Sequence, residues 1–145
     1  MDEESNSILD KVRTWLREEE IQENKIDNTI GVTFWYSKEF PLAATVIHDK
    51  ITVLCELSFD DVISNLLISN KNYFHELDLS LHQQNPRFIF TFSDDTHTKL
   101  VGIRIFKDIW SDSLTKTSFF DSIVAIEHSV HIVMIKARQW SMLRT

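Results

Sequence analysis

Glycine is scarce in this sequence of 145 residues, which contains only two, Gly31 and Gly102. A loop that cradles phosphate groups needs several glycines, because a backbone without side chains comes closest to the ligand. No dinucleotide-binding turn, Walker loop or kinase-type loop can therefore be written along this chain. The shortage excludes the commonest classes of nucleotide-dependent enzyme.

Cysteine and long apolar runs are also nearly absent. Cys55 is the single cysteine, so no intramolecular disulfide can form, and its apolar strand-like surroundings predict a buried, inert thiol. The N-terminal sequence MDEESNS is acidic and polar, unlike a signal or transit peptide. No uninterrupted apolar run approaches the roughly 20 residues that a membrane span needs. We therefore expect a cytoplasmic protein that does not contact a membrane.

Basic residues are in the minority. The chain has 15 Lys and Arg against 22 Asp and Glu, a net charge of -7. This sign disfavours nucleic acid as a partner, since phosphate contacts need clustered basic side chains. The apolar fraction of 43% and charged fraction of 26% are typical of a globular protein. The length predicts a single domain spanning residues 1–145.

Hydrophobic periodicity predicts eight segments of secondary structure. Apolar residues at helical spacing indicate a first helix over residues 7–20 with Ser7 as its N-cap. Its last residues, 18–20, are three glutamates, which oppose the helix dipole and predict a frayed or solvated end, with a partner site as the alternative. Alternating or β-branched runs predict strands over residues 30–36, 42–48, 51–57, 87–93 and 100–106.

The segments between the strands indicate how they are connected. Residues 59–84 read as helical in two pieces, with Ser58 or Asp60 as the cap and a break at residues 70–72. Asp49-Lys50 is the expected two-residue turn between the second and third strands. Gly102 is expected to mark a bulge or the close approach of a helix.

These segments together predict an α+β fold. The order of the elements is α-β-β-β-α-β-β-α. We expect the five strands to form one antiparallel sheet, with the helices packed mainly on one of its faces. This architecture is typical of binding modules.

The last predicted helix, from about Thr117 to Trp140, carries an apolar seam at strict 4-3 spacing. Residues 130–137 are apolar around most of the circumference, so this helix must be covered on more than one side. We predict that part of the seam forms an interface with a partner or a second copy, with burial in the protein's own core as the alternative. The predicted interface residues are Phe119, Ile123, Ile126, Val130, Val133 and Trp140.

Two clusters have the side chains that metals prefer, but neither matches a metal-binding motif. Glu127, His128 and His131 share helical spacings, yet they lie beside the apolar seam with no further ligand group nearby in sequence. Asp94, Asp95 and His97 are better explained as parts of a polar turn over residues 94–99. The sequence therefore predicts no metal and no cofactor.

No residues form a recognisable catalytic motif either. The serines lack a nucleophile elbow, and nothing places His48 beside a nucleophile. We expect that the protein is not an enzyme.

The element order, together with the stretch KNYFHELDLSLHQQNPRFIFTFSDD (residues 71–95), resembles the type III secretion chaperone-like fold. The stretch is similar to small uncharacterised archaeal proteins with that fold. The resemblance covers nearly the whole chain but includes no family-specific functional residues. It implies a five-stranded antiparallel sheet, a homodimer and protein binding without catalysis.

The sequence thus predicts a non-enzymatic, chaperone- or adaptor-like interaction module that is homodimeric. Its binding surfaces would be a sheet edge or face and the apolar stripe of the last helix. The alternative is a small ligand-binding protein or enzyme with a pocket between sheet and helices, and with His48 or His97 at its mouth.

Overall fold

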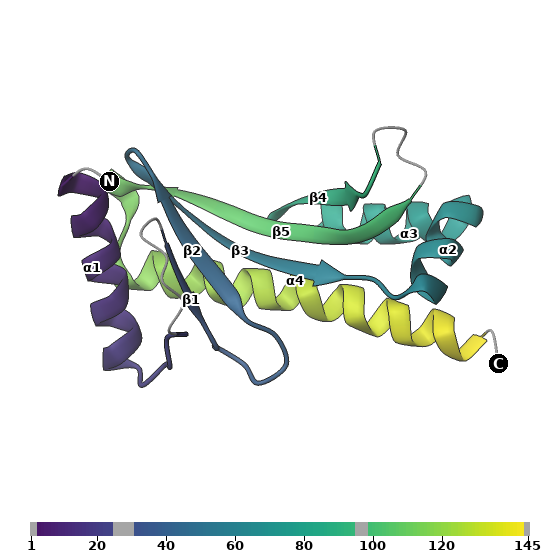
Figure 1. The fold of residues 1–145 in the computed structure, drawn as a ribbon, viewed down its shortest axis with the longest axis horizontal. Coiled ribbons are helices and arrows are strands. Elements are labelled where there is room, and N and C mark those ends of the chain that lie inside the picture. The colour runs from purple at the N-terminus through teal and green to yellow at the C-terminus, as the bar shows by residue number, and fades with distance from the viewer. Residues whose placement is uncertain (1–2, 25–30, 95–98, 144–145) are drawn as a thin grey trace. The chain divides into compact units, whose positions relative to one another are not determined.

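The computed structural model describes residues 3–24, 31–94 and 99–143. Within these residues the elements follow the predicted order, which confirms the α+β class (Figure 1). They are α1 (Glu3–Glu18), β1 (Gly31–Phe34), β2 (Leu42–Ile47), β3 (Lys50–Ser58), α2 (Asp61–Ser69), α3 (Lys71–His82), β4 (Arg87–Phe92), β5 (Leu100–Trp110), the 3-10 turn η1 (Ser111–Ser113) and α4 (Lys116–Leu143).

The strands form one five-stranded antiparallel sheet in the order β1-β2-β3-β5-β4. The chain divides into two compact units. The first unit contains Met1–Cys55 and Phe106–Val124, and the second contains Glu56–Ile105 and Ala125–Thr145. Strands β3 and β5 and helix α4 contribute residues to both units. A single domain over residues 1–145 stays a prediction.

Helix α1 is longer at its start than expected and does not fray at its end. The amide of Ile21 donates to the carbonyl of Leu16 at 2.8 Å, and that of Glu20 donates to Arg17 at 3.0 Å. Glu20 has a φ of 56°. These bonds form a Schellman motif, in which a left-handed residue satisfies the last carbonyls of a helix. Of the two predicted outcomes, solvation is observed, since residues 18–20 are exposed, whereas fraying is not, because backbone capping outweighs the unfavourable charges.

The turn between β2 and β3 lies one residue earlier than expected. Ile47 pairs with Lys50, so the two-residue loop is His48-Asp49. His48 adopts the left-handed φ of 56°, which histidine tolerates better than most non-glycine residues. Moving the turn by one residue changes each cross-strand pairing by two positions, so the same side chains of β3 stay on the buried face.

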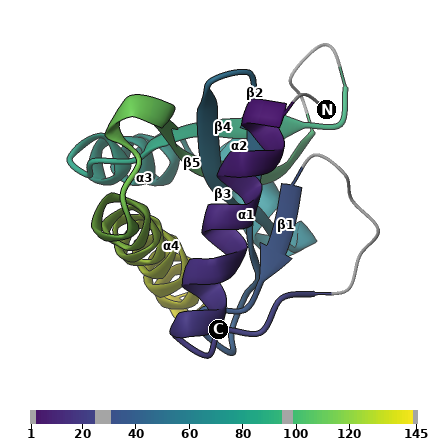
Figure 2. The same ribbon diagram turned by 90° about the vertical axis from the view of Figure 1, so that its left-hand side faces the viewer.

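In the first unit, one face of the sheet is buried beneath helices. Helix α1 packs against β1 and β2 (Figure 2). The ring of Phe119 from α4 lies 5.9 Å from Trp15 of α1 and 6.1 Å from Phe34 of β1. The buried apolar residues of the strands in this unit are Val32, Phe34, Leu42, Ala44, Val46, Ile51, Val53, Cys55 and Ile109. Cys55 is thus a buried thiol, as expected.

The second unit confirms the predicted break between two helices. Asp60 caps α2 by accepting a hydrogen bond from the amide of Ile63 at 2.8 Å. Asn70 ends α2 and begins α3, because its amide donates to Leu66 while its side chain accepts from the amide of Asn72. One asparagine therefore satisfies backbone groups of both helices.

Gly102 stands where two strands approach each other closely. A Cβ atom at this position would lie 2.1 Å from the carbonyl oxygen of Leu57 in β3. The expected close approach is therefore present, but the neighbour is a strand and not a helix. Strand β5 also runs on to Trp110, four residues beyond the predicted end.

Replacing Glu20 with glycine should stabilise the protein. The change removes the steric cost of a left-handed side chain, and we expect a gain of about 1 kcal/mol in the free energy of unfolding. Glu20→Ala is the matched control, since it removes the same charge but keeps the Cβ atom. Urea denaturation measures both, and equal effects of the two variants would contradict a backbone origin.

Candidate functional site

The six residues predicted as an interface are all buried within the chain. Their exposed fractions are 0% for Phe119, Ile123, Ile126 and Val130, 3% for Val133 and 4% for Trp140. In the second unit the ring of Trp140 packs 5.2 Å from that of Tyr73. The core alternative accounts for this burial. That a partner also reaches these side chains stays a prediction.

Val130→Asp distinguishes the two roles. A carboxylate at a fully buried position should cost roughly 4 kcal/mol or more and unfold the protein. Val124→Asp is the control on the same helix, because Val124 is 53% exposed and its replacement should cost less than about 1 kcal/mol. Circular dichroism and thermal melts report both, and a folded, monomeric Val130→Asp protein would support the interface role instead.

The candidate metal ligands do not assemble into a site. Among the described residues, no group of three or more His, Cys, Asp or Glu is arranged to hold a metal ion. On α4, Glu127 and His131 are half-buried while His128 is exposed. Asp95 and His97 lie outside the described residues, and at the ends of that turn Asp94 accepts a hydrogen bond from the amide of Lys99 at 3.2 Å.

The face of the sheet opposite the helices is open in the first unit. Ile47 and Trp110 are each 56% exposed there. Ile47 pairs with Lys50 across the β2–β3 ladder, and the Lys50 ammonium lies 5.9 Å from the centre of the Trp110 ring. These three residues, with Thr52 and Asp108, are called the open-face patch below. The patch contains an exposed tryptophan, a residue type that is enriched at protein interfaces.

Polar contacts hold the open-face patch in place. The carboxylate of Asp108 accepts a hydrogen bond from Thr52 at 2.5 Å and pairs with the ammonium of Lys50 at 3.4 Å. The Lys50 and Asp108 side chains are 32% and 22% exposed, so this pair is only partly solvated. A side chain that is already ordered loses less conformational entropy when a partner binds.

A groove of about 650 Å³ lies between the end of α1 and the start of α4 in the first unit. Ile21, Tyr36 and Phe120 provide its apolar lining, while Glu19 and Asp121 provide carboxylates. We call it the α1–α4 groove. The residues that line it are Glu19, Ile21, Tyr36, Lys116, Thr117, Phe120 and Asp121.

Reciprocal hydrogen bonds fix the start of α4 beside this groove. The Ser118 hydroxyl lies 2.8 Å from the amide of Thr115, and the Thr115 hydroxyl lies 3.0 Å from the amide of Ser118. This is the pattern of a capping box, which satisfies amides that a helix start leaves without partners.

Lys116 links α4 to the acidic end of α1. Its ammonium lies 2.7 Å from Glu19 and 3.5 Å from Glu18. The hydrogen bond to Glu19 raises the pKa of Lys116 above its ordinary value, with a smaller contribution from the Glu18 charge, and these outweigh the lowering by desolvation. The acidic run is therefore partly paired, although its side chains stay exposed as the sequence predicted.

The raised pKa of Lys116 predicts a stability that declines at high pH. Because the folded form holds this proton more tightly than the unfolded form, the ion pairs stabilise the protein below the ordinary lysine pKa of about 10.4. That contribution is lost as the pH rises through the higher folded value. The stability difference between wild type and Lys116→Met, measured by denaturation from pH 8 to 12, should shrink above about pH 10.4.

Lys11→Met is the matched control, since Lys11 lies on the exposed face of α1 in the same unit. Its stability difference from wild type should change less over the same pH range. An equal decline in both variants would contradict a specific role for Lys116.

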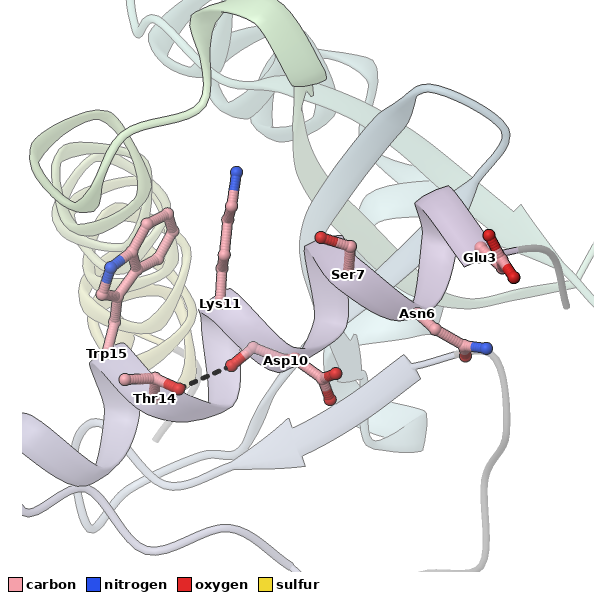
Figure 3. Close-up of a pocket in the computed structure, with 7 residues that line it drawn as sticks. All are labelled: Glu3, Asn6, Ser7, Asp10, Lys11, Thr14 and Trp15. Atoms are coloured by element: carbon pink, nitrogen blue, oxygen red, sulfur yellow. Dashed lines mark hydrogen bonds between the residues drawn. The ribbon is translucent and has the colours of Figure 1, made fainter.

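A second groove, of about 470 Å³, follows the exposed face of α1 (Figure 3). Thr14 donates to the backbone carbonyl of Asp10 at 2.8 Å within it. All of its lining residues come from one helix, so no second element encloses a ligand. They are Glu3, Asn6, Ser7, Asp10, Lys11, Thr14 and Trp15. His48, proposed for the mouth of a pocket, instead lies exposed in the β2–β3 turn.

Among the described residues, one helix is long and apolar enough to cross a membrane. This is α4, Lys116–Leu143, with a mean hydropathy of 1.3 over its most apolar window, of which 39% is buried in the protein. A helix that packs its apolar side chains inside its own protein meets the same criteria, so the finding is weak support for a membrane span. The absence of membrane contact stays a prediction.

No protein-family model and no curated protein matches this chain. Solved structures do match. An uncharacterized protein from Methanothermobacter thermautotrophicus has a TM-score of 0.71 at 15% identity, covering 90% of this chain and 96% of that one. YbjN, described as a putative transcription regulator from E. coli, has a TM-score of 0.64 at 16% identity, covering 90% and 92%.

A chain of the ExsC–ExsE complex has a TM-score of 0.52 at 12% identity, covering 89% of this chain and 92% of its own. At such identities these likenesses show the fold alone. They support the fold expected from the sequence over nearly the whole chain, and a chaperone-like role stays a prediction. The archaeal part of the resemblance stays a prediction.

Proposed function

We propose that this protein is a non-enzymatic interaction module, chaperone- or adaptor-like, that binds a protein partner on the open face of its sheet. The observation that carries the proposal is the open-face patch, where Ile47 and Trp110 remain exposed on either side of an ordered Lys50. The likeness in fold to a chain of the ExsC–ExsE complex adds support. Cytoplasmic location and the lack of catalysis belong to the same proposal.

Burial of the open-face patch against a partner would contribute binding free energy from a small contact area. Tryptophan dominates binding energy at many interfaces, because it buries a large apolar surface with few rotatable bonds. Removing the exposed Trp110 and Ile47 side chains from water would contribute roughly 1.5–3 kcal/mol each at most. The paired Lys50 and Asp108 charges at the edge would favour a particular orientation of the partner more than raw affinity.

Site-specific photo-cross-linking in the source cells tests the proposal. A benzophenone amino acid in place of Trp110 should form a discrete adduct with a protein, and Ile47→Glu in the same chain should reduce that adduct at least about fivefold because it disrupts the patch. The matched control carries the cross-linker in place of Leu79 on α3, which is similarly exposed. Equal adducts from both positions, or none from the patch, would refute the open face as the binding surface.

The proposed homodimer is tested separately by light scattering coupled to size-exclusion chromatography at several concentrations. A dimer should have twice the mass of the 17.1 kDa chain. Loss of that dimer in Trp110→Glu, with Leu79→Glu unchanged, would place the contact on the open face. A monomer at all concentrations would exclude the homodimer and leave a different protein as the partner.

A further inference from the structure

We infer that the α1–α4 groove binds a basic segment of a partner protein, in which a Lys or Arg is flanked by an apolar side chain. This inference goes beyond the proposed function, because the groove shares no residue with the open-face patch. It depends on how charge is distributed along the chain and on what lines the groove.

The net charge is concentrated in the unit that contains the groove. The first unit has 14 acidic and 8 basic residues, a net charge of -6, whereas the second has 8 and 7, a net charge of -1. A surface of one sign attracts partners of the opposite sign and raises their rate of association. A basic segment would therefore meet this unit in preference to the other.

The lining of the groove matches both parts of such a segment. Ile21, Tyr36 and Phe120 offer apolar surface for an aliphatic side chain or for the methylene stem of a Lys or Arg. Glu19 and Asp121 offer carboxylates, one from the end of α1 and one from the second turn of α4. Lys116 already binds Glu19 at 2.7 Å, so the groove accommodates an ammonium group in the geometry that a partner would use.

An anionic occupant is the opposite possibility, since a helix start attracts negative charge. Two features oppose it. The hydrogen bonds between Thr115 and Ser118 already satisfy amides at the start of α4. The carboxylates of Glu18, Glu19 and Asp121 together outnumber the single ammonium of Lys116. Full charges at this range outweigh the partial charge of a helix dipole, so a cation is favoured.

Fluorescence anisotropy with two labelled heptapeptides tests the inference. One has the sequence Arg-Leu-Arg-Phe-Arg-Leu-Arg, and the other carries glutamate in place of each arginine. The full-length protein should bind the arginine peptide at least about tenfold more tightly than the glutamate peptide. No preference between the peptides would overturn the inference.

A pair of variants with equal charge separates the groove from the overall charge. Glu19→Gln with Asp121→Asn should weaken binding of the arginine peptide about tenfold, whereas Glu3→Gln with Asp10→Asn on α1 should weaken it less than about twofold. The single variant Asp121→Asn leaves the ion pairs of Lys116 with Glu18 and Glu19 intact and should still weaken binding of the arginine peptide severalfold. Equal losses of affinity in the two double variants would mean that only net charge attracts the peptide, and this result would refute the groove as the binding site.

The open face provides the last control. Trp110→Glu should leave binding of the arginine peptide unchanged within about twofold, because Trp110 does not line the groove. Loss of binding in this variant would place the peptide on the open face and overturn the inference. A normal circular dichroism spectrum and unfolding transition are required of every variant compared.

Discussion

The apolar seam of α4 organises the packing within each of the two units. A helix with apolar side chains on most of its circumference must be covered on more than one side. In the first unit, Phe119 meets this requirement between Trp15 of α1 and Phe34 of β1. In the second, Trp140 packs on Tyr73 of α3. Each unit therefore covers its own part of the seam with side chains of another helix.

Because helices cover the seam from one side of the sheet, the two faces of the sheet differ in how far their side chains are buried. In the first unit, helices bury one face, and the side chains of the other face remain half-buried or exposed. Isolated surface apolar residues are common, but Ile47 and Trp110 lie on either side of Lys50, which Asp108 holds in place. This ordered arrangement favours the open face as a partner surface over an incidental exposure.

The acidic end of α1 shows how one local feature can have two roles. Three successive glutamates at a helix end are electrostatically unfavourable, yet the Schellman motif at Glu20 and the pairing of Glu18 and Glu19 with Lys116 hold them in an ordered position. The same carboxylates then border a groove with an apolar lining. Order of this kind lowers the entropic cost of recognising a basic partner.

The class of fold, the order of elements, the break at residues 70–72 and the apolar seam could be predicted from the sequence, because these depend on periodicity and on contacts only a few residues apart. The choice of Asp60 over Ser58 as the cap of α2, and the double role of Asn70, came from the structure. The burial of the seam and the exposure of Ile47 and Trp110 depend instead on tertiary packing. It also brought Lys116 to Glu19, 97 positions away in the sequence. Spacing along a chain defines one face of an element, but what covers that face depends on residues that are distant in sequence.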